Sequence, residues 1–318
     1  MPDKTHYDLI ILGAGPAGMT AAVYAARKQM DVLIITENVG GQTTWSADIE
    51  NYLGFRLITG PELVAKFEDH VSQFSVPREF TKVTRLTRPG PDFAIETEGG
   101  RTFTSRVVIV ATGKSPRLLG VPGEKEFTGR GVTYCATCDG PIFAGKDVLV
   151  AGGGNSGLDA VVQLMKICPK VYLVERESKL RADAVMISRA RAAGNVEILT
   201  DTAVVEIVGE TFVNAATVKG LDGGAPRRLD VEGVFVEVGL IPNTDFVKDV
   251  VRLNPIGEIP VDCAARTGIP GLYAAGDATD VPEKQIIIAA GDGAKAALGA
   301  YSYVVRLPAN DDWGRMPT

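Results

Sequence analysis

The chain has 318 residues, a formal net charge of −6 at pH 7 and a hydrophobic fraction of 45%. This length suggests two domains, and the balance of apolar and charged residues excludes disordered and fibrous classes. Because no block of basic residues stands out, no nucleic-acid partner is expected. The sequence shows neither the apolar stretch of a signal peptide nor the roughly 18 apolar residues that span a bilayer, which favours a cytoplasmic protein without membrane association.

The first predicted elements form a β-α-β unit. Residues 7–12 predict a buried parallel strand, residues 19–27 a helix, and residues 31–35 a second strand. The turn before the helix has a G-x-G-x-x-G pattern made of Gly13, Ala14, Gly15, Pro16, Ala17 and Gly18. Its glycines permit a tight turn, let the backbone approach a pyrophosphate and let the helix pack closely on the strand. The unit predicts a dinucleotide site, with Glu37, just beyond the expected strand end, as the candidate ribose partner.

A second β-α-β unit follows, 139 residues after the first. Before it, residues 61–74 predict a helix, residues 82–105 antiparallel strands, and residues 107–111 a buried strand that ends at Thr112 and Gly113. The second unit consists of strand 147–151, helix 158–167 and strand 170–174, and its turn contains Gly152, Gly153, Gly154, Asn155, Ser156 and Gly157. Such an internal repeat predicts two nucleotide-binding domains.

Charged residues after the second unit bear on which nicotinamide cofactor binds. Glu175 ends the second strand, where a carboxylate accepts hydrogen bonds from ribose hydroxyls and repels a 2′-phosphate, which favours NADH over NADPH. Arg176 and Arg181 lie nearby and could tolerate a 2′-phosphate, whereas Glu177 adds negative charge. The alternative is that residues 175–181 form only a solvated charged loop.

The last predicted elements are strand 231–238, strand 271–275, which ends at Gly276 and Asp277, and helix 286–305. If residues 276–277 belong with the first unit, the second domain is an insertion between two halves of the first. The sequence therefore predicts an α/β fold with two Rossmann-like, three-layer domains, the second inserted in the first.

Cys135 and Cys138 have C-x-x-C spacing, and thiols at this spacing can form a reducible disulfide. Zinc would need a second Cys pair or two His, and the chain has only two scattered His and two isolated further Cys, so no metal site is expected. Asp139 is a candidate to move a proton to or from a leaving thiolate, the alternative being a turn or N-cap residue.

The motifs GAGPAG, GGQ, CATCDG, GGGNSG and AAGDATD, in this order, closely resemble those of low-molecular-weight bacterial thioredoxin reductases. The resemblance implies an FAD-binding domain of residues 1–115 and 242–318, an NAD(P)H-binding domain of residues 116–241 that carries the Cys pair, a homodimer and a domain rotation. The implied FAD contacts are Gly13, Gly15, Pro16, Ala17, Gly18, Glu37, Gly41, Gln42, Asn51, Thr112, Gly113, Gly276, Asp277, Lys284, Gln285 and Ile286. The implied nicotinamide-cofactor contacts are Gly152, Gly154, Asn155, Ser156, Gly157, Glu175, Arg176 and Arg181.

Two departures from NADPH-using members stand out. Their His-Arg-Arg-x-x-x-Arg pattern reads Glu-Arg-Glu-x-x-x-Arg here over residues 175–181, and Gly157 stands where they usually have Ala. Both features look more like the NADH-using flavoprotein that serves alkyl hydroperoxide reductase, whose extra N-terminal thioredoxin-like domain this chain is too short to hold. The Arg-Gln-Ala common near the flavin reads Lys-Gln-Ile over residues 284–286.

The resemblance implies an FAD enzyme that passes electrons from NADH, with NADPH as the alternative, to the Cys135–Cys138 disulfide and on to a thioredoxin-like protein. By family analogy, electrons enter the disulfide through Cys138, Cys135 attacks the partner disulfide, and Asp139 supplies the proton. Three alternatives stay open. The donor could be ferredoxin or another one-electron carrier, with Trp313 stacked on the flavin; the protein could be a dithiol oxidase that forms hydrogen peroxide; or it could be a non-catalytic flavin redox sensor.

Overall fold

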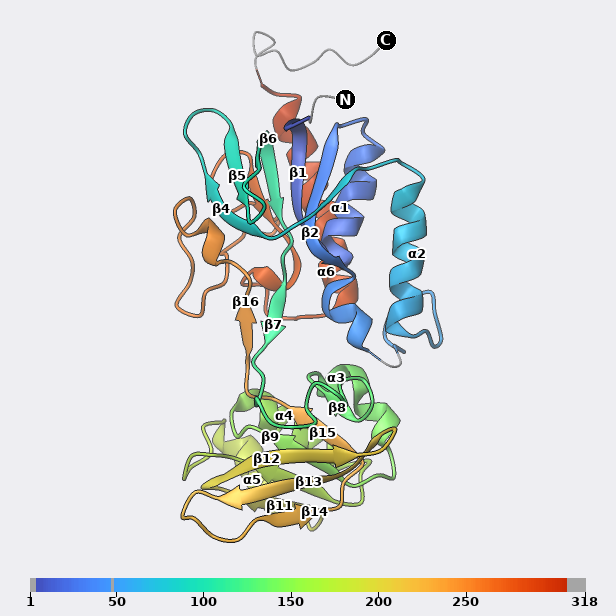
Figure 1. The fold of residues 1–318 in the computed structure, drawn as a ribbon, viewed down its shortest axis with the longest axis vertical. Helices are drawn as coiled ribbons and strands as arrows, with labels where there is room; N and C mark the ends of the chain where they lie inside the picture. Colours follow the sequence, from blue (N-terminus) through green and yellow to red (C-terminus); the bar gives the residue numbers. More distant parts are fainter. Residues whose placement is uncertain (1–3, 47–48, 308–318) are drawn as a thin grey trace. The chain divides into compact units, whose positions relative to one another are not determined.

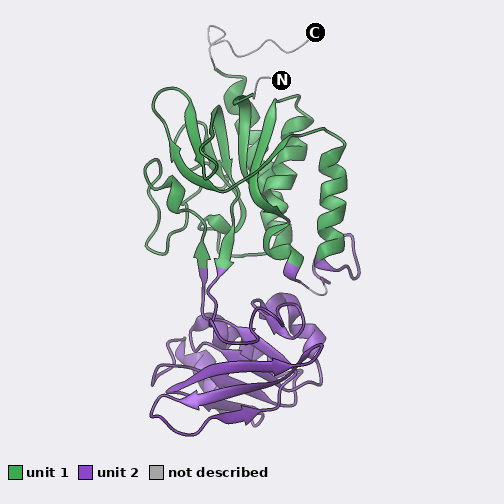
Figure 2. Cartoon of the chain, viewed as in Figure 1, with its two compact units in different colours: residues 1–44, 61–115, 241–318 green, residues 45–60, 116–240 purple. Residues whose placement is uncertain are grey.

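The computed structural model describes residues 4–46 and 49–307, so the predicted tail with Trp313 lies outside the described residues. The chain divides into two compact units (Figure 2). Unit 1 comprises residues 1–44, 61–115 and 241–318, and unit 2 comprises residues 45–60 and 116–240. The chain passes between them through β7 (Lys114–Pro116) and β16 (Leu240–Pro242), which pair in a two-stranded sheet.

The grouping of residues 45–60 with unit 2 differs from the expected boundary, which placed them in the first domain. The ring of Trp45 lies 6.3 Å from that of Tyr134, and a Cβ on Gly129 would lie 3.2 Å from the Trp45 carbonyl oxygen. An isolated bridge joins Ile49 to Ile58. Long-range contacts of this kind leave no periodic signal in the sequence.

Unit 1 is built around a seven-stranded sheet (Figure 1). Its order is β3-β2-β1-β6-β5-β4, with β17 also paired to β6. The pairs among β3, β2, β1, β6 and β17 are parallel, and those among β6, β5 and β4 are antiparallel. The elements are β1 (His6–Ala14), α1 (Pro16–Ala26), β2 (Val32–Val39), η1 (Gly41–Trp45), α2 (Gly60–Ser72), β3 (Arg78–Phe80), β4 (Val83–Thr87), β5 (Phe93–Thr97), β6 (Thr102–Val110), η3 (Asp245–Val247), β17 (Leu272–Ala274), η4 (Gly276–Ala278) and α6 (Ile286–Val304).

The central strand β1 is buried on both faces, as its apolar run predicts. Leu9 and Ile11 join a core with α1 and α6, whereas Ile10 and Leu12 join a second core with β5 and η3. Helices α1 and α6 pack closely because α6 has a glycine at the contact: a Cβ on Gly293 would lie 2.0 Å from an α1 carbonyl oxygen. This packing fixes the start of α1 at the carboxyl edge of the sheet.

Unit 2 has a five-stranded parallel sheet in the order β11-β10-β9-β15-β8 and a three-stranded antiparallel sheet in the order β12-β13-β14. Its elements are β8 (Val132–Thr133), α3 (Ala136–Asp139), η2 (Gly140–Phe143), β9 (Val148–Ala151), α4 (Asn155–Leu164), β10 (Val171–Val174), α5 (Ala184–Ala192), β11 (Val196–Leu199), β12 (Thr202–Gly209), β13 (Val213–Gly220), β14 (Arg227–Leu229) and β15 (Gly233–Val236). With the same strand-turn-helix order at β1-α1 and at β9-α4, the predicted α/β fold with two Rossmann-like units is confirmed.

Several predicted elements differ in extent from the structure, among them β2, β6 and α4. Strand β2 runs on to Val39, which still pairs with Ala14, so Glu37 lies within the strand rather than beyond it. Strand β6 is continuous and combines the end of the predicted antiparallel region with the predicted strand 107–111. Helix α4 begins at Asn155 rather than at residue 158, because the glycine turn itself supplies the N-cap residue.

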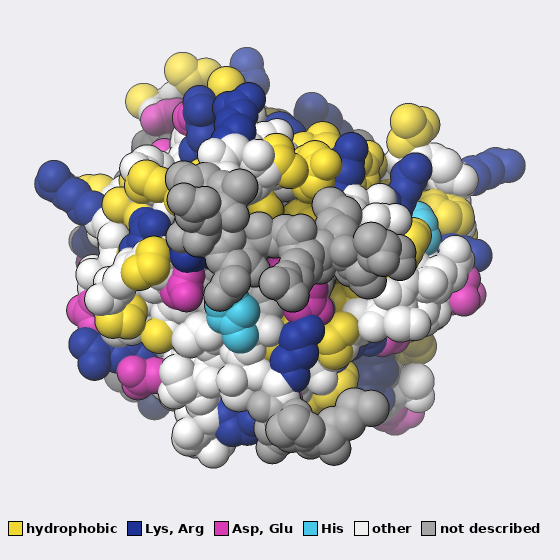
Figure 3. Space-filling view, turned by 90° about the horizontal axis from the view of Figure 1, so that it is seen from above, with side chains coloured by type: hydrophobic (Ala, Val, Ile, Leu, Met, Phe, Trp, Pro, Cys, Tyr) yellow, Lys and Arg dark blue, Asp and Glu magenta, His cyan; other side chains and the backbone are white. Residues whose placement is uncertain are grey.

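Within residues 4–46 and 49–307, no helix is both long and apolar enough to cross a membrane. On the face seen in Figure 3, the described basic and acidic side chains are interspersed rather than sorted into regions of one sign.

Candidate active site

The two glycine turns adopt the same geometry. Gly13 and Gly152 have positive φ angles of 105° and 120°, a region that favours glycine. A Cβ on Gly18 would lie 1.9 Å from the carbonyl oxygen of Gly13, and a Cβ on Gly157 would lie 1.8 Å from that of Gly152. In each unit, therefore, the third glycine lets the helix pack directly on the turn.

The middle glycine of each turn faces open space. Gly15 and Gly154 are the N-cap residues of α1 and α4, with φ and ψ of −77° and −174° and of −83° and −174°. No side chain caps either helix, and a Cβ on either glycine would have no other atom within 4 Å. Each turn thus leaves room for a phosphate to reach backbone N–H groups at a helix start, so both fit a dinucleotide.

Several other residues predicted to contact FAD converge on the first turn. A Cβ on Gly41 would lie 4.0 Å from the Cα of Gly15, and one on Gly13 would lie 3.1 Å from the Cα of Thr112. A Cβ on Gly276 would lie 3.1 Å from the Cβ of Ala17. The structure therefore brings segments far apart in the sequence to the start of α1.

The remaining candidates on this side lie at varied positions. Gln42 donates a hydrogen bond to the carbonyl oxygen of Lys114, and the Gly113 carbonyl accepts one from the Asn243 amide. Gln285 is the N-cap residue of α6, so Ile286 begins that helix, and Pro16 begins α1. Two candidates are set apart: the side chain of Glu37 is exposed on β2, and Asn51 is exposed in the segment that groups with unit 2.

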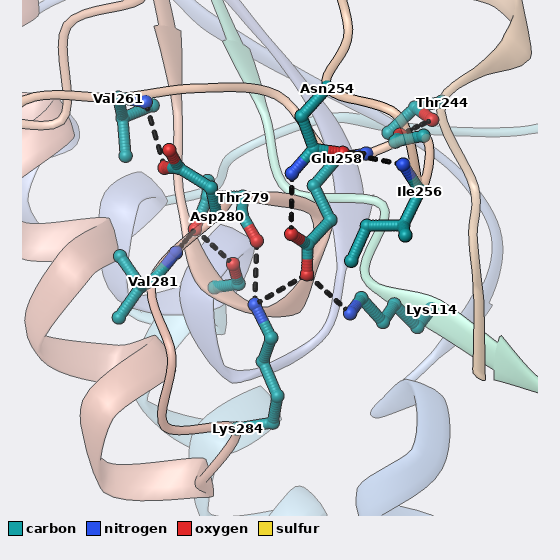
Figure 4. A network of polar contacts seen from close by, with 12 residues as sticks. Lys114, Thr244, Asn254, Ile256, Glu258, Val261, Thr279, Asp280, Val281 and Lys284 are labelled. Carbon is teal, nitrogen blue, oxygen red and sulfur yellow. Dashed lines mark hydrogen bonds and ion pairs between the residues drawn. The ribbon is translucent and has the colours of Figure 1, made fainter. Parts of the chain in front are cut away.

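A buried ion network surrounds the Lys284 candidate (Figure 4). The Glu258 carboxylate accepts from Lys114 at 2.6 Å and lies 3.2 Å from the Lys284 ammonium. Lys284 also donates to the Thr279 carbonyl oxygen at 2.6 Å, and Asn254 donates to the other Glu258 oxygen. The side chains of Lys114 and Glu258 are each only 8% exposed, so this network fixes Lys284 by desolvated bonds.

The network also determines the acidity of nearby carboxyl groups. Burial alone would raise the pKa of Glu258, but hydrogen bonds from Lys114, Asn254 and Lys284 outweigh it and hold that pKa below its usual range. For Asp277, burial raises the pKa despite attraction from the same two lysines. Glu258 is therefore anionic at neutral pH, which balances one of the two lysine charges.

Cys135 and Cys138 are joined in a disulfide within unit 2, with their Cα atoms 5.3 Å apart. Cys135 is the N-cap residue of the short helix α3, and its sulfur accepts a hydrogen bond from the Cys138 amide at 3.2 Å. Both cysteines are partly exposed, whereas Asp139 is buried and its carboxylate accepts a hydrogen bond from the Thr133 hydroxyl. The predicted disulfide is thus present, with a carboxyl group next to it in sequence.

The second turn has acidic and basic residues beside it. The Glu175 carboxylate accepts hydrogen bonds from the Gly153 and Glu177 amides, which places it at the edge of the turn. The Arg181 amide donates to the Gly153 carbonyl at 2.9 Å, while its guanidinium forms an exposed ion pair with Glu177. Arg176, Asn155 and Ser156 are exposed, and the Asn155 side chain accepts from the Asp183 amide.

Three residues that the sequence reading did not select belong to these surroundings. Glu258 and Lys114 build the ion network, and the carboxyl of Glu237 accepts a hydrogen bond from the Ala136 amide at 3.3 Å, next to the disulfide. Only Glu237 could have been selected from the sequence, because it directly follows a buried strand of a parallel sheet, at the edge where ligands bind.

A dinucleotide turn in each unit and a disulfide beside the second one define a class of protein: a redox protein that couples two nucleotides to a dithiol. The family model of pyridine nucleotide-disulphide oxidoreductases matches residues 7–293, and the chain belongs to this family. It is accordingly an oxidoreductase of a family that uses a flavin, FAD, and a pyridine nucleotide.

Relatives and solved structures agree with this assignment. The chain is 43% identical over 310 residues to a component of the alkyl hydroperoxide reductase of Xanthomonas campestris pv. phaseoli, covering 96% of this chain and 58% of that one. It is 41% identical over 305 residues to an NADH dehydrogenase of Bacillus subtilis, covering 96% and 60%. The chain thus spans about three fifths of the length of these curated relatives.

Among solved structures, thioredoxin reductase from Streptococcus pyogenes matches with a TM-score of 0.90 and 40% identity, covering 95% of this chain and 99% of that one. Thioredoxin reductase from Giardia duodenalis matches with a TM-score of 0.87 and 33% identity, covering 95% and 100%. The resemblance to low-molecular-weight thioredoxin reductases is therefore confirmed across almost the whole chain.

Proposed function

We propose that the chain is a thioredoxin-disulfide reductase that takes electrons from NADH and delivers them through FAD and Cys135–Cys138 to a thioredoxin-like protein. The observation that carries this proposal is the partly exposed disulfide in the same unit as the second glycine turn. The thioredoxin reductases of similar structure support a thioredoxin-like acceptor. In the same proposal, the protein acts as a cytoplasmic homodimer.

Each unit has a separate role in this proposal. In unit 1, the Gly15 turn at the start of α1 and residues 284–286 would hold FAD. In unit 2, the Gly154 turn would hold the nicotinamide cofactor. When bound, the two cofactors supply hydride transfer from nicotinamide to flavin and a two-electron reductant for the disulfide.

The residues around the disulfide perform the remaining chemistry. Two electrons break the Cys135–Cys138 bond, and the Cys135 sulfur then attacks the disulfide of the partner protein and forms a mixed disulfide. The Cys138 sulfur resolves that mixed disulfide, which restores the bond to Cys135 and releases the reduced partner. Asp139 exchanges the proton with the departing thiolate, and the Thr133 hydroxyl holds its carboxyl in place.

The preference for NADH rests on Glu175. Its carboxylate accepts from the Gly153 amide, where it would accept hydrogen bonds from the ribose of a nucleotide bound to this turn and would repel a 2′-phosphate. The exposed Arg181 forms an ion pair with Glu177, and this neighbouring negative charge weakens the attraction of Arg181 for a 2′-phosphate. The Bacillus relative named as an NADH dehydrogenase supports the same cofactor.

Steady-state kinetics test the proposal directly. Reduction of a bacterial thioredoxin is followed with NADH and with NADPH, alongside an anaerobic titration of the flavin absorbance with NADH, NADPH and reduced ferredoxin. We expect turnover of thioredoxin and a higher kcat/KM with NADH. If only reduced ferredoxin bleached the flavin, the protein would be a ferredoxin-fed reductase. Oxygen uptake with a dithiol alone would identify an oxidase, and no turnover with any donor would identify a sensor.

A further inference from the structure

Glu237 lies between the helix that follows Cys135 and the second glycine turn. Glu237 follows β15 directly, and its side chain accepts a hydrogen bond at 3.3 Å from the amide of Ala136, the residue after Cys135. Its carbonyl oxygen would lie 2.5 Å from a Cβ on Gly152. One residue therefore contacts both the helix that carries the disulfide and the turn that fits a dinucleotide.

Three carboxyl groups lie on or next to the elements of unit 2 that surround the end of β15. They are Asp159 on α4, Asp139 on α3 and Glu175 after β10, and Asp159 interacts with Glu237 electrostatically. Burial raises the pKa of the Glu237 carboxyl to about 7, although the Ala136 amide opposes the rise and Asp159 adds to it. Glu237 thus changes its charge in the pH range in which thiols become reactive.

We propose that Glu237 is a positioning residue that sets the acidity of the Cys135 thiol. The inference rests on the proposed function, in which the disulfide takes up two electrons from the reduced flavin. With two protons it gives two thiols, and with one proton it gives a thiol and a thiolate. A thiolate on Cys135 is stabilised by the Cys138 amide, which already donates to that sulfur at 3.2 Å.

The Glu237 carboxyl accepts from the amide of the residue that follows Cys135, so its charge lies near this thiolate. An ionised carboxylate on the Ala136 amide repels a neighbouring thiolate and raises the pKa of the thiol, whereas a neutral carboxyl does not. The two groups therefore titrate together, and each holds back the ionisation of the other.

Thiol alkylation measures this coupling without nicotinamide, thioredoxin or turnover. The full-length flavoprotein is reduced with excess dithiothreitol, freed of it anaerobically and treated with iodoacetamide between pH 5 and pH 10. Mass spectrometry then follows each cysteine separately. The exposed Cys263 serves as an internal reference, and the wild type is compared with Glu237→Gln and Glu237→Ala.

The Gln variant decides the question because it keeps an oxygen for the Ala136 amide and removes only the charge. We expect Glu237→Gln to lower the pH midpoint of Cys135 alkylation by about one unit, while the Cys263 midpoint stays unchanged. If Glu237 only shaped the turn, Gln would match the wild type and Ala alone would differ, which would overturn the inference. Because dithiothreitol reduces the disulfide in place of nicotinamide and flavin, the outcome is independent of whether the proposed turnover is observed.

Discussion

The third glycine of the second turn offers a sharp test of the site geometry. In Gly157→Ala, the new Cβ would lie 1.8 Å from the backbone carbonyl oxygen of Gly152, a contact that no side-chain rotation can relieve. Overpacking of this kind costs about 3 kcal/mol, and the better helix propensity of Ala returns about 1 kcal/mol. We expect unit 2 to lose about 2 kcal/mol of its free energy of unfolding.

Gly154→Ala is the matched control in the same turn. Its φ of −83° suits any residue, and its Cβ would have no other atom within 4 Å. Ala is a poorer N-cap residue than Gly, but it also reduces the conformational entropy of the unfolded chain, and the two effects nearly cancel. The free energy of unfolding should therefore stay within about 0.5 kcal/mol of the wild-type value. The methyl group occupies the space that a bound phosphate needs, so NADH affinity should nevertheless fall.

Urea unfolding followed by circular dichroism and calorimetric titration with NADH separate the two effects. We expect a stability loss for Gly157→Ala and a binding loss at wild-type stability for Gly154→Ala. Equal stability losses in both variants, or wild-type stability of Gly157→Ala, would refute the steric argument.

Three further results are expected. Cys138→Ser should keep bound FAD, seen in the absorbance spectrum, but reduce thioredoxin at a negligible rate; wild-type-like turnover would reject the mechanism. Glu258→Ala leaves two lysines without their shared carboxylate and should destabilise unit 1 by about 3 kcal/mol or more in urea unfolding. The control Asp249→Ala breaks an exposed ion pair with Arg85 and should cost at most about 1 kcal/mol. Because the pKa of Glu237 is raised from 4.5 to about 7, its contribution to the free energy of unfolding is fully present below about pH 4.5 and is lost as the pH rises through 7. The free energy of unfolding of Glu237→Gln, relative to that of the wild type, should therefore rise by about 3 kcal/mol between pH 4 and pH 8. A difference between the two proteins that stays constant with pH would contradict the assignment.

The glycine turns and the disulfide could be predicted because their chemistry is local. A G-x-G-x-x-G pattern after an apolar strand specifies the positive φ of Gly13 and Gly152 and the close contacts of Gly18 and Gly157 within a few residues. Similarly, C-x-x-C spacing alone brings Cys135 and Cys138 within reach of a disulfide.

The ion network and the contact between Glu237 and Ala136 could not be predicted because the partners are distant in the sequence. Glu258 and Lys114 are separated by 144 positions, and Glu237 and Ala136 by 101. In the sequence, Glu258 and Lys114 appear as isolated charged residues, and only the buried strand before Glu237 marks that position. The antiparallel strands β12, β13 and β14 were missed for a related reason, since their pairing places residues on one face without any motif to mark it.

The most direct test of electron flow to the disulfide is a thiol count on the denatured protein after anaerobic incubation with excess NADH. Of the four cysteines, Cys168 and Cys263 are free in the oxidised structure. We expect the count to rise from two thiols per chain to four as the flavin absorbance falls. A count that stays at two in the presence of NADH would contradict the proposed path from nicotinamide to the Cys135–Cys138 disulfide.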